Sequence, residues 1–373
     1  MTERGVTEAD AMRLAIALAE HGEGDVNPNP LVGAVVLKDG EVIGRGYHKE
    51  FGGPHAEVFA LRDAGDAARG ATLVVTLEPC CCHGKTPPCT DAIVAAGISR
   101  VVVAQRDPSP QIAGKGIEIL RAARIEVEEG LLREEASRQA EVFLAYVTQG
   151  RPFVQLKLAS SLDGRIATRT GDAKWISGPA SRVEAHRLRR RLSAILVGVG
   201  TVVADDPRLD VRHVIGKNPV PVVLDPSGRI PLDARVLSSS AKPIVVTAAM
   251  PADVEEFLRS RGVRVWRLSV DDSGRLDLTE LLDRLGAEGG IDSVLVEGGG
   301  ETAASFLDAN VVDKVSILLA PILIGGRDAI PAIGGLGAAR IADASRLHDV
   351  TIRQVGDDLL VTGYPHRRAT LSS

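Results

Sequence analysis

The segment Thr76–Cys89 reads TLEPCCCHGKTPPC and holds all four cysteines of the chain. It begins in the last two residues of the apolar run Thr72–Leu77, which predicts a buried strand, and it leads into Thr90–Ala96, which predicts a helix. The thiols all lie within ten residues, and no secretion signal accompanies them. Clustered thiols in such a chain indicate a metal-binding or catalytic loop rather than a disulfide framework.

The tripeptide His55-Ala56-Glu57 supplies the other groups that a catalytic metal site needs. A His-x-Glu sequence followed by Pro-Cys and a later cysteine has the order of a zinc nucleobase deaminase site, although eight residues rather than two separate Cys80 from Cys89. One histidine and two thiolates leave the fourth position of Zn²⁺ open for water, whose pKa the metal lowers towards about 7. A carboxylate that does not bind the metal then carries the proton, and Glu57 is the candidate.

The alternative is a structural zinc site that three or four residues of the Cys loop close, namely Cys80, Cys81, Cys82, His83 and Cys89. Adjacent cysteines rarely chelate one tetrahedral ion together, and a structural site does not need Glu57. His55 and Glu57 converge only where a helix begins at His55, because residues two apart inside a helix diverge by about 200°. The preceding Gly52-Gly53-Pro54 favours that start, so the pattern favours the catalytic site and leaves the structural one open.

Strand-like and helix-like segments alternate around this site. Thr7 can cap a helix over Glu8–Glu20, and the dipeptide Asp39-Gly40 suits a tight hairpin between strands at Leu31–Leu37 and Glu41–Tyr47. A helix is also predicted from about His55, with later helices at Gly116–Ala123 and Arg133–Val147 and strands at Arg100–Ala104 and Ile125–Glu128. Glycine and proline in the segment 148–152 then interrupt the regular secondary structure. We therefore predict two α/β domains, residues 1–147 and 148–373.

The second domain repeats the α/β alternation. Its predicted strands are Phe153–Leu158, Ala194–Val199, Val220–Asp225, Pro243–Ala248, Val263–Leu268, Ser293–Glu297 and Lys314–Leu319, with two antiparallel strands from Val350 to Tyr364. Its predicted helices are Ser181–Leu192, Ala252–Ser260, Leu278–Leu285 and Glu301–Asp308.

Basic and glycine-rich segments of the second domain suit a phosphate-bearing ligand. Four arginines, Arg187, Arg189, Arg190 and Arg191, fall on one predicted helix, where a solvated basic face is the alternative. Gly198-Val199-Gly200 lacks the third glycine of the dinucleotide fingerprint. Glu297–Gly300 ends a strand and begins a helix, where free backbone N–H groups can receive phosphate, with a simple turn as the alternative. Asp205 can polarise a reacting sugar or can belong to a turn with Asp206-Pro207.

The composition limits the classes of function. The chain has 373 residues, of which 45% are apolar, and a net charge of −5. It therefore lacks the basic excess that binding to nucleic acid or to a membrane surface needs. Uncharged runs reach only thirteen residues, against the roughly 20 that span a bilayer, and the charged stretch Met1–Asp10 is unlike a signal peptide. We expect a cytoplasmic protein that acts on a small molecule, with no nucleic-acid or membrane partner.

The Cys loop, together with Asn29–Ala34 and His55-Ala56-Glu57, resembles the family of bifunctional riboflavin-biosynthesis deaminase–reductases. The resemblance covers nearly the whole chain through the segments 106–108, 114–116, 157–164, 174–176, 200–207, 296–299 and 320–326. It implies an α/β chain with an N-terminal cytidine-deaminase-like three-layer domain and a C-terminal dihydrofolate-reductase-like domain. Zinc and NADPH are the implied cofactors, and we expect a homo-oligomer.

The resemblance also implies two reactions. The first domain would remove the 2-amino group of 2,5-diamino-6-ribosylamino-4(3H)-pyrimidinone 5′-phosphate, and the second would reduce the ribosyl group to ribityl with NADPH. His55, Cys80 and Cys89 would hold zinc, and Glu57 would carry the proton. The residues that would contact the deaminase substrate are Asn29, His48, Lys85 and Asp107. The implied cofactor contacts are Ala159, Trp175, Thr201, Asp205, Gly299, Gly300, Glu301, Thr302, Ala303, Ala304 and Ser305, with Asp205 also a catalytic candidate. The implied contacts of the reductase substrate are Lys157, Arg189, Leu209, Arg212 and Glu297.

Three positions depart from the family pattern. Cys81-Cys82 stand where the family has Ser-His, Ser109 replaces an asparagine, and Ala173 replaces a serine. None of them alters the predicted zinc ligands or Glu57.

Two further hypotheses stay open. One is a zinc deaminase of another base, in cytidine or in tRNA, with an unrelated second domain. The other is a non-catalytic binding protein stabilised by zinc.

Overall fold

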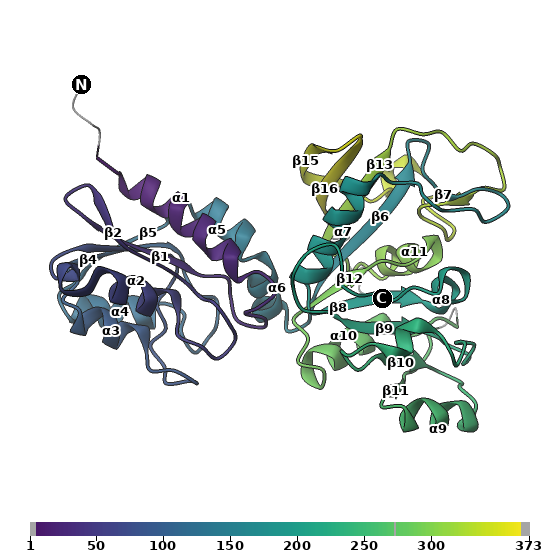
Figure 1. Cartoon of the computed structure of the whole chain (residues 1–373), viewed down its shortest axis with the longest axis horizontal. Helices are drawn as coiled ribbons and strands as arrows, with labels where there is room; N and C mark the ends of the chain where they lie inside the picture. Colours follow the sequence, from purple (N-terminus) through teal and green to yellow (C-terminus); the bar gives the residue numbers. More distant parts are fainter. Residues whose placement is uncertain (1–4, 272–273, 367–373) are drawn as a thin grey trace. The chain divides into compact units, whose positions relative to one another are not determined.

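The computed structural model describes residues 5–271 and 274–366. The chain forms two compact units, Met1–Arg151 and Pro152–Ser373, coloured purple to blue and teal to yellow in Figure 1. The sequence-based boundary between residues 147 and 148 lies inside the helix α6 (Glu141–Gln149), which ends at Gly150 with a positive φ of 69°. Among the described residues, no helix is both long enough and apolar enough to cross a bilayer.

A five-stranded sheet in the order β2-β1-β3-β4-β5 forms the centre of the first unit. β1 pairs antiparallel with β2 and β3, whereas β3, β4 and β5 are parallel. Its strands are β1 (Gly33–Lys38), β2 (Glu41–Tyr47), β3 (Thr72–Leu77), β4 (Arg100–Gln105) and β5 (Glu126–Glu129). Its helices are α1 (Glu8–Ala19), α2 (Ala56–Ala64), α3 (Cys89–Ala95), α4 (Lys115–Ala122), α5 (Arg133–Gln139) and α6.

Helices cover both faces of this sheet because alternate strand residues point to opposite sides. Val36, Val75 and Val103 pack in a core with residues of α2, α3 and α4. Val35 and Val74 pack on the other face with residues of α1 and α5. The result is the three-layer α/β arrangement that we predicted.

Local signals set the ends of several elements. Thr7 and Asp10 form a capping box at the start of α1, and Asp39 and Gly40 both take positive φ in the hairpin between β1 and β2. The predicted helix 133–147 is instead two helices that meet at Ala140. The break has no glycine or proline to mark it in the sequence, and the side chain of Ala140 is buried.

A nine-stranded sheet in the order β11-β10-β9-β8-β12-β6-β13-β16-β15 forms the second unit. Its strands are β6 (Phe153–Ser161), β8 (Ala194–Gly198), β9 (Val220–Leu224), β10 (Ile244–Thr247), β11 (Arg264–Arg267), β12 (Ser293–Val296), β13 (Lys314–Ala320), β15 (Leu347–Val355) and β16 (Asp358–Pro365). The short strands β7 (Arg165–Ala167) and β14 (Ile330–Pro331) pair separately. Its helices are α7 (Pro179–Arg191), α8 (Val199–Asp205), α9 (Ala252–Ser260), α10 (Leu278–Ala287) and α11 (Gly300–Asp308).

The strands from β11 to β13 are parallel, and β13, β16 and β15 are antiparallel, as predicted. α10 and α11 pack on one face of the sheet, and α8 and α9 pack on the other. The helix α8 was not predicted, because glycine and β-branched residues dominate the start of Val199–Asp205 and disfavour a helix. Since β8 and β12 are parallel neighbours, their carboxyl ends place the starts of α8 and α11 at one edge of the sheet.

Candidate active sites

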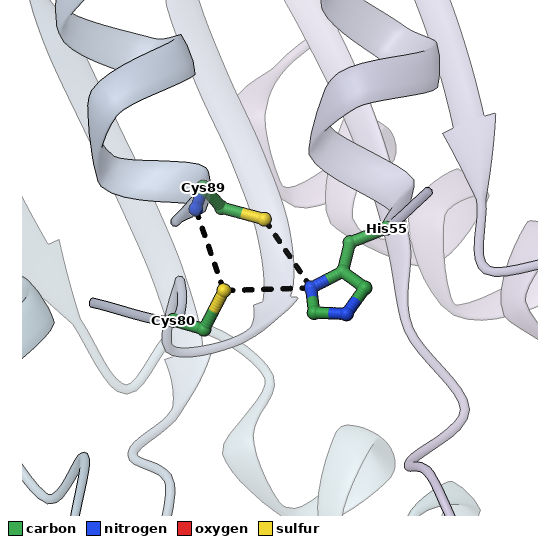
Figure 2. A group of neighbouring side chains, drawn as sticks. All are labelled: His55, Cys80 and Cys89. Carbon is green, nitrogen blue, oxygen red and sulfur yellow. Dashed lines mark hydrogen bonds between the residues drawn. The ribbon is translucent and has the colours of Figure 1, made fainter. Parts of the chain in front are cut away.

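Three potential metal ligands meet in the first unit between two helix starts and a strand end. His55 is the N-cap of α2, Cys80 follows β3, and Cys89 is the first residue of α3. The His55 Nδ1 atom and the two Sγ atoms all lie within 4.8 Å of one another, and Figure 2 shows the three side chains directed at a common point. The Nδ1 atom is 3.5 Å from Cys80 Sγ and 3.3 Å from Cys89 Sγ. The predicted start of a helix at His55 is what makes this meeting possible.

The chemistry of this donor set fits zinc. Hydrogen bonds from Cys89 and His55 lower the pKa of the Cys80 thiol to about 4, and the backbone N–H of Cys89 also donates to Cys80 Sγ. One imidazole and two thiols are a ligand set typical of a zinc site that keeps one position open. In the described part of the chain, Cys81, Cys82 and His83 do not join this group. The arrangement therefore favours the open site over the structural zinc site.

Glu57 lies beside the metal ligands and belongs to the first turn of α2. Its side chain is only 3% exposed, and its Oε2 atom has no hydrogen-bond partner among the described residues. Burial raises the pKa of its carboxyl group. A buried carboxyl group with a free oxygen beside a metal site is suited to proton transfer.

A cavity of about 410 Å³ opens over His55, Cys80 and Glu57. The four residues expected to contact the substrate all line it, namely Asn29, His48, Lys85 and Asp107. The structure thus gathers them around the metal ligands from four separate segments of the sequence.

The polar groups of the cavity are held in fixed orientations. His48 Nδ1 donates to the carbonyl of Pro54 at 3.0 Å, and its Nε2 accepts from Asn29 Nδ2 at 3.0 Å. Burial lowers the pKa of His48, so its imidazole is neutral at pH 7. Burial also raises the pKa of Asp107 to about 6, although Asp107 Oδ1 accepts from the backbone N–H of Ser109 at 2.8 Å. Lys85 Nζ is exposed and lies 3.8 Å from the centre of the Phe51 ring.

Several residues of the cavity wall were not predicted from the sequence. Phe51, Ile112 and Phe143 supply apolar surface, and Glu78 also lines the cavity. The position of Glu78 directly before Pro79-Cys80 was the one available signal, because a residue so close to a ligand must lie near the site.

A buried charge cluster occupies the second unit. Glu297 accepts two hydrogen bonds of 2.9 Å from Arg189, and Lys157 Nζ is 3.6 Å from its Oε2 atom. Burial alone would raise the pKa of Glu297, but Arg189 and Lys157 outweigh it and lower the pKa to about 2. Arg189 also donates to the carbonyl of Asp210 at 3.1 Å, which ties the cluster to the loop that follows α8.

That loop holds the two other residues expected on the substrate side. Arg212 pairs with Asp210 at 2.5 Å, and its backbone N–H donates to His186 Nδ1 at 3.1 Å. Leu209 has a positive φ of 55°, and its side chain packs in the core. A contact between Leu209 and a ligand would therefore come from its backbone.

The expected cofactor contacts gather where β8 and β12 end. A Cβ atom on Gly198 would lie 2.7 Å from Thr302 Oγ1, whereas one on Gly200 would meet no atom within 4 Å. Thr201 lies beside Gly299, which precedes α11. Gly200 of α8 borders open space, and Gly299, at the start of the nine-residue helix α11, lies beside α8, so the free backbone N–H groups at the start of α11 fit the phosphate groups of a dinucleotide.

The remaining cofactor candidates are spread around this edge. Ala303 and Ala304 are buried in the core, and Ser305 Oγ donates to the carbonyl of Glu301 at 2.9 Å. Lys174 Nζ is 3.5 Å from Asp205, and the exposed ring of Trp175 lies 4.7 Å from the Arg182 guanidinium. Ala159 lies in β6 opposite Leu318 of β13.

Comparisons with known proteins match each of the two units to a family. Residues 6–105 match the family described as the cytidine and deoxycytidylate deaminase zinc-binding region, and residues 152–361 match the RibD C-terminal domain. Fold and site therefore define a zinc-dependent deaminase domain followed by a reductase domain. The RibD riboflavin biosynthesis proteins of Aquifex aeolicus and Escherichia coli are 45% and 40% identical over 94% and 93% of this chain, and over 96% of each relative. The chain belongs to the RibD family of riboflavin biosynthesis proteins.

Solved structures of the family cover both units. RibD of Acinetobacter baumannii (form 1) is 38% identical with a TM-score of 0.87, and a Thermotoga maritima deaminase/reductase is 42% identical with a TM-score of 0.82. Each match covers 96% of this chain and 99% of the other. Zinc and NADPH are the cofactors of the two domains. The hypotheses of an unrelated second domain and of a non-catalytic binding protein are thereby wrong.

Proposed function

We propose that this chain hydrolyses the 2-amino group of 2,5-diamino-6-ribosylamino-4(3H)-pyrimidinone 5′-phosphate and then reduces the ribosyl group with NADPH. The product is 5-amino-6-ribitylamino-uracil 5′-phosphate. The observation that carries the proposal is the group of His55, Cys80 and Cys89 with Glu57 beside it, in a cavity of about 410 Å³. The Thermotoga maritima relative, a diaminohydroxyphosphoribosylaminopyrimidine deaminase and 5-amino-6-(5-phosphoribosylamino)uracil reductase, supports the choice of substrate.

The buried and the exposed residues of the first unit have different roles in the deamination. His55, Cys80 and Cys89 would hold zinc, which would supply the Lewis acidity that activates water. Glu57 takes the proton of the attacking water on its free Oε2 atom and delivers it to the amino group that leaves as ammonia. The buried residues His48 and Asp107, together with Asn29, bind the base, and the exposed Lys85 binds the phosphate.

The residues of the second unit hold substrate and cofactor near one another. NADPH supplies the hydride. The starts of α8 and α11, with Thr201, Asp205 and Gly299–Ser305, bind the cofactor, and Ala159 and Trp175 contact it. Lys157, Arg189, Arg212 and Glu297, with the backbone of Leu209, bind the substrate. Asp205 polarises the reacting sugar.

The proposal is tested with purified, zinc-loaded protein and the diaminopyrimidine ribosyl phosphate. Ammonia should appear without NADPH, and absorbance at the nicotinamide band should fall once NADPH is added. Removal of zinc with a chelator should abolish ammonia release and leave the reduction of pre-deaminated substrate unchanged, because the group of metal ligands found among the described residues belongs to the first unit. Turnover of cytidine or a tRNA loop in place of this substrate would contradict the proposal.

A small-molecule substrate requires no macromolecular partner. We propose that the chain binds no nucleic acid, since its net charge is −5, and that it works in the cytoplasm, where its four cysteines stay reduced as thiols.

We further propose that the chain forms a homo-oligomer through the edge strand β15. No strand among the described residues pairs with its outer edge, and the side chains of Val350 and Ile352 are 49% and 65% exposed. Ile352→Lys should lower the mass measured by sedimentation to that of a smaller assembly, because it buries a charge in the interface. Ile215→Lys, on a loop residue that is 94% exposed, should leave the mass unchanged. A wild-type chain that sediments as a monomer would contradict the proposal.

A further inference from the structure

Glu78 is a buried carboxylate whose two oxygens are both occupied by backbone N–H groups. It directly follows β3, and its side chain is 3% exposed. Its Oε2 atom accepts from Asp107 and Gly114 at 3.3 and 3.0 Å. Its Oε1 atom accepts from Gly116 and Ile117 at 3.0 and 3.3 Å. Four N–H donors on one carboxylate form a charge-assisted network that no neutral side chain of this size reproduces.

These donors lie at the two ends of one loop. The segment 106–114 connects β4 to α4, with Asp107 at its start and Gly114 as the N-cap of α4. Residues of this loop form one wall of the deaminase cavity, namely Asp107, Ser109, Gln111 and Ile112. Glu78 thus joins both ends of the wall to the strand that leads to Cys80.

Two of the residues that donate to Glu78 must be glycine, one because of close packing and one because of its backbone conformation. A Cβ atom on Gly116 would lie 2.2 Å from the carbonyl oxygen of Pro79, and Gly114 has a positive φ of 86°. The carboxylate also lies at the N-terminus of α4, where negative charge is favourable. The sequence Gly114-Lys115-Gly116 therefore fits a backbone segment that folds around this one side chain.

We propose that Glu78 is a positioning residue of the deaminase site, because its carboxylate fixes the loop 106–114 and so sets where Asp107 meets the substrate. The inference rests on the proposed function, since Asp107 is assigned there to bind the base. Glu78 does not touch the reacting atoms in this assignment, so its loss should act on binding and leave the metal site intact.

The test is Glu78→Gln in the full chain. Glutamine has one acceptor oxygen and places an amide group against N–H donors, so one end of the loop loses its anchor. We expect KM for ammonia release to rise about tenfold, equivalent to about 1.4 kcal/mol, with kcat changed by less than about threefold. Hydrogen exchange in the segment 106–117 should become faster, while exchange in β4 stays slow. Zinc content and the reduction of pre-deaminated substrate should equal those of the wild type.

The matched control is Glu118→Gln, which removes the same charge from the exposed face of α4 and should change none of these values. Unchanged exchange and KM in Glu78→Gln would overturn the inference, and so would a loss of zinc with a fall in kcat. If Glu78→Gln does not fold, Glu78→Asp, which keeps the charge but withdraws both oxygens, is measured in the same way. A wild-type chain without ammonia release would contradict the proposed function, whereas the exchange measurement tests the loop anchor independently.

Discussion

Glu57→Gln is expected to lower the rate of ammonia release by about 10³-fold, within the range of about 10² to 10⁴ that general acid–base catalysis contributes. Glutamine has nearly the same shape but can neither accept nor donate the transferred proton. The effect should be large because Glu57 is buried and its Oε2 atom has no other partner among the described residues. Ammonia is measured without NADPH, and zinc content is measured on the same sample.

The reductase domain provides the internal control for this substitution. NADPH oxidation with pre-deaminated substrate should not change, since Glu57 lies in the first unit. Glu134→Gln, on the exposed side of α5, removes a carboxylate of the same unit and should retain deamination. Deamination by Glu57→Gln at the wild-type rate would show that Glu57 does not transfer the proton. The glutamate of the His-x-Glu sequence would then have no catalytic role.

The order of elements was predictable where local chemistry decides it. The cap at Thr7, the hairpin at Asp39-Gly40 and the antiparallel end of the second sheet are all confirmed. The helix α8 was not predictable, because its residues favour a strand locally and the contacts of Val199 and Val202 with the core decide otherwise. The break at Ala140 likewise depends on packing that a single sequence does not contain.

The meeting of His55, Cys80 and Cys89 was predictable because each residue type has a specific chemistry and the spacing is unusual. The charge cluster of the second unit was not predictable from composition, since Lys157, Arg189 and Glu297 are far apart in the sequence. The four arginines of α7 show that a run of like residues does not reveal which of them are buried. Arg189 is 13% exposed and pairs with Glu297, whereas Arg187 is 62% exposed and pairs with Glu184 on the helix surface. The solvated interpretation therefore applies to Arg187, whereas the buried Arg189 stays a predicted binding residue.

Glu297→Ala is expected to lower the free energy of unfolding of the second unit by about 3–5 kcal/mol, because it leaves two cations buried without their partner. Arg189 and Lys157 converge on this carboxylate, and their side chains are only 13% and 12% exposed. Urea unfolding followed by tryptophan fluorescence measures this unit selectively, since both tryptophans, Trp175 and Trp266, belong to it. NADPH oxidation should be lost in the same variant.

Asp206→Asn serves as the control, because the pair of Asp206 and Arg235 is half exposed, so water screens it and its loss should change the free energy of unfolding little. The pH dependence gives a second measurement. The pKa of Glu297 is about 2 in the folded chain against an ordinary value of 4.5. Its ionised carboxylate therefore contributes fully to the free energy of unfolding above pH 4.5, and this contribution is lost as the pH falls towards 2. Glu297→Gln should remove this part of the acid dependence. If Glu297→Ala unfolds at the same midpoint urea concentration as the wild type, the buried Arg189 does not depend on this carboxylate for stability. Another residue would then have to hold Arg189 in place for its role in substrate binding.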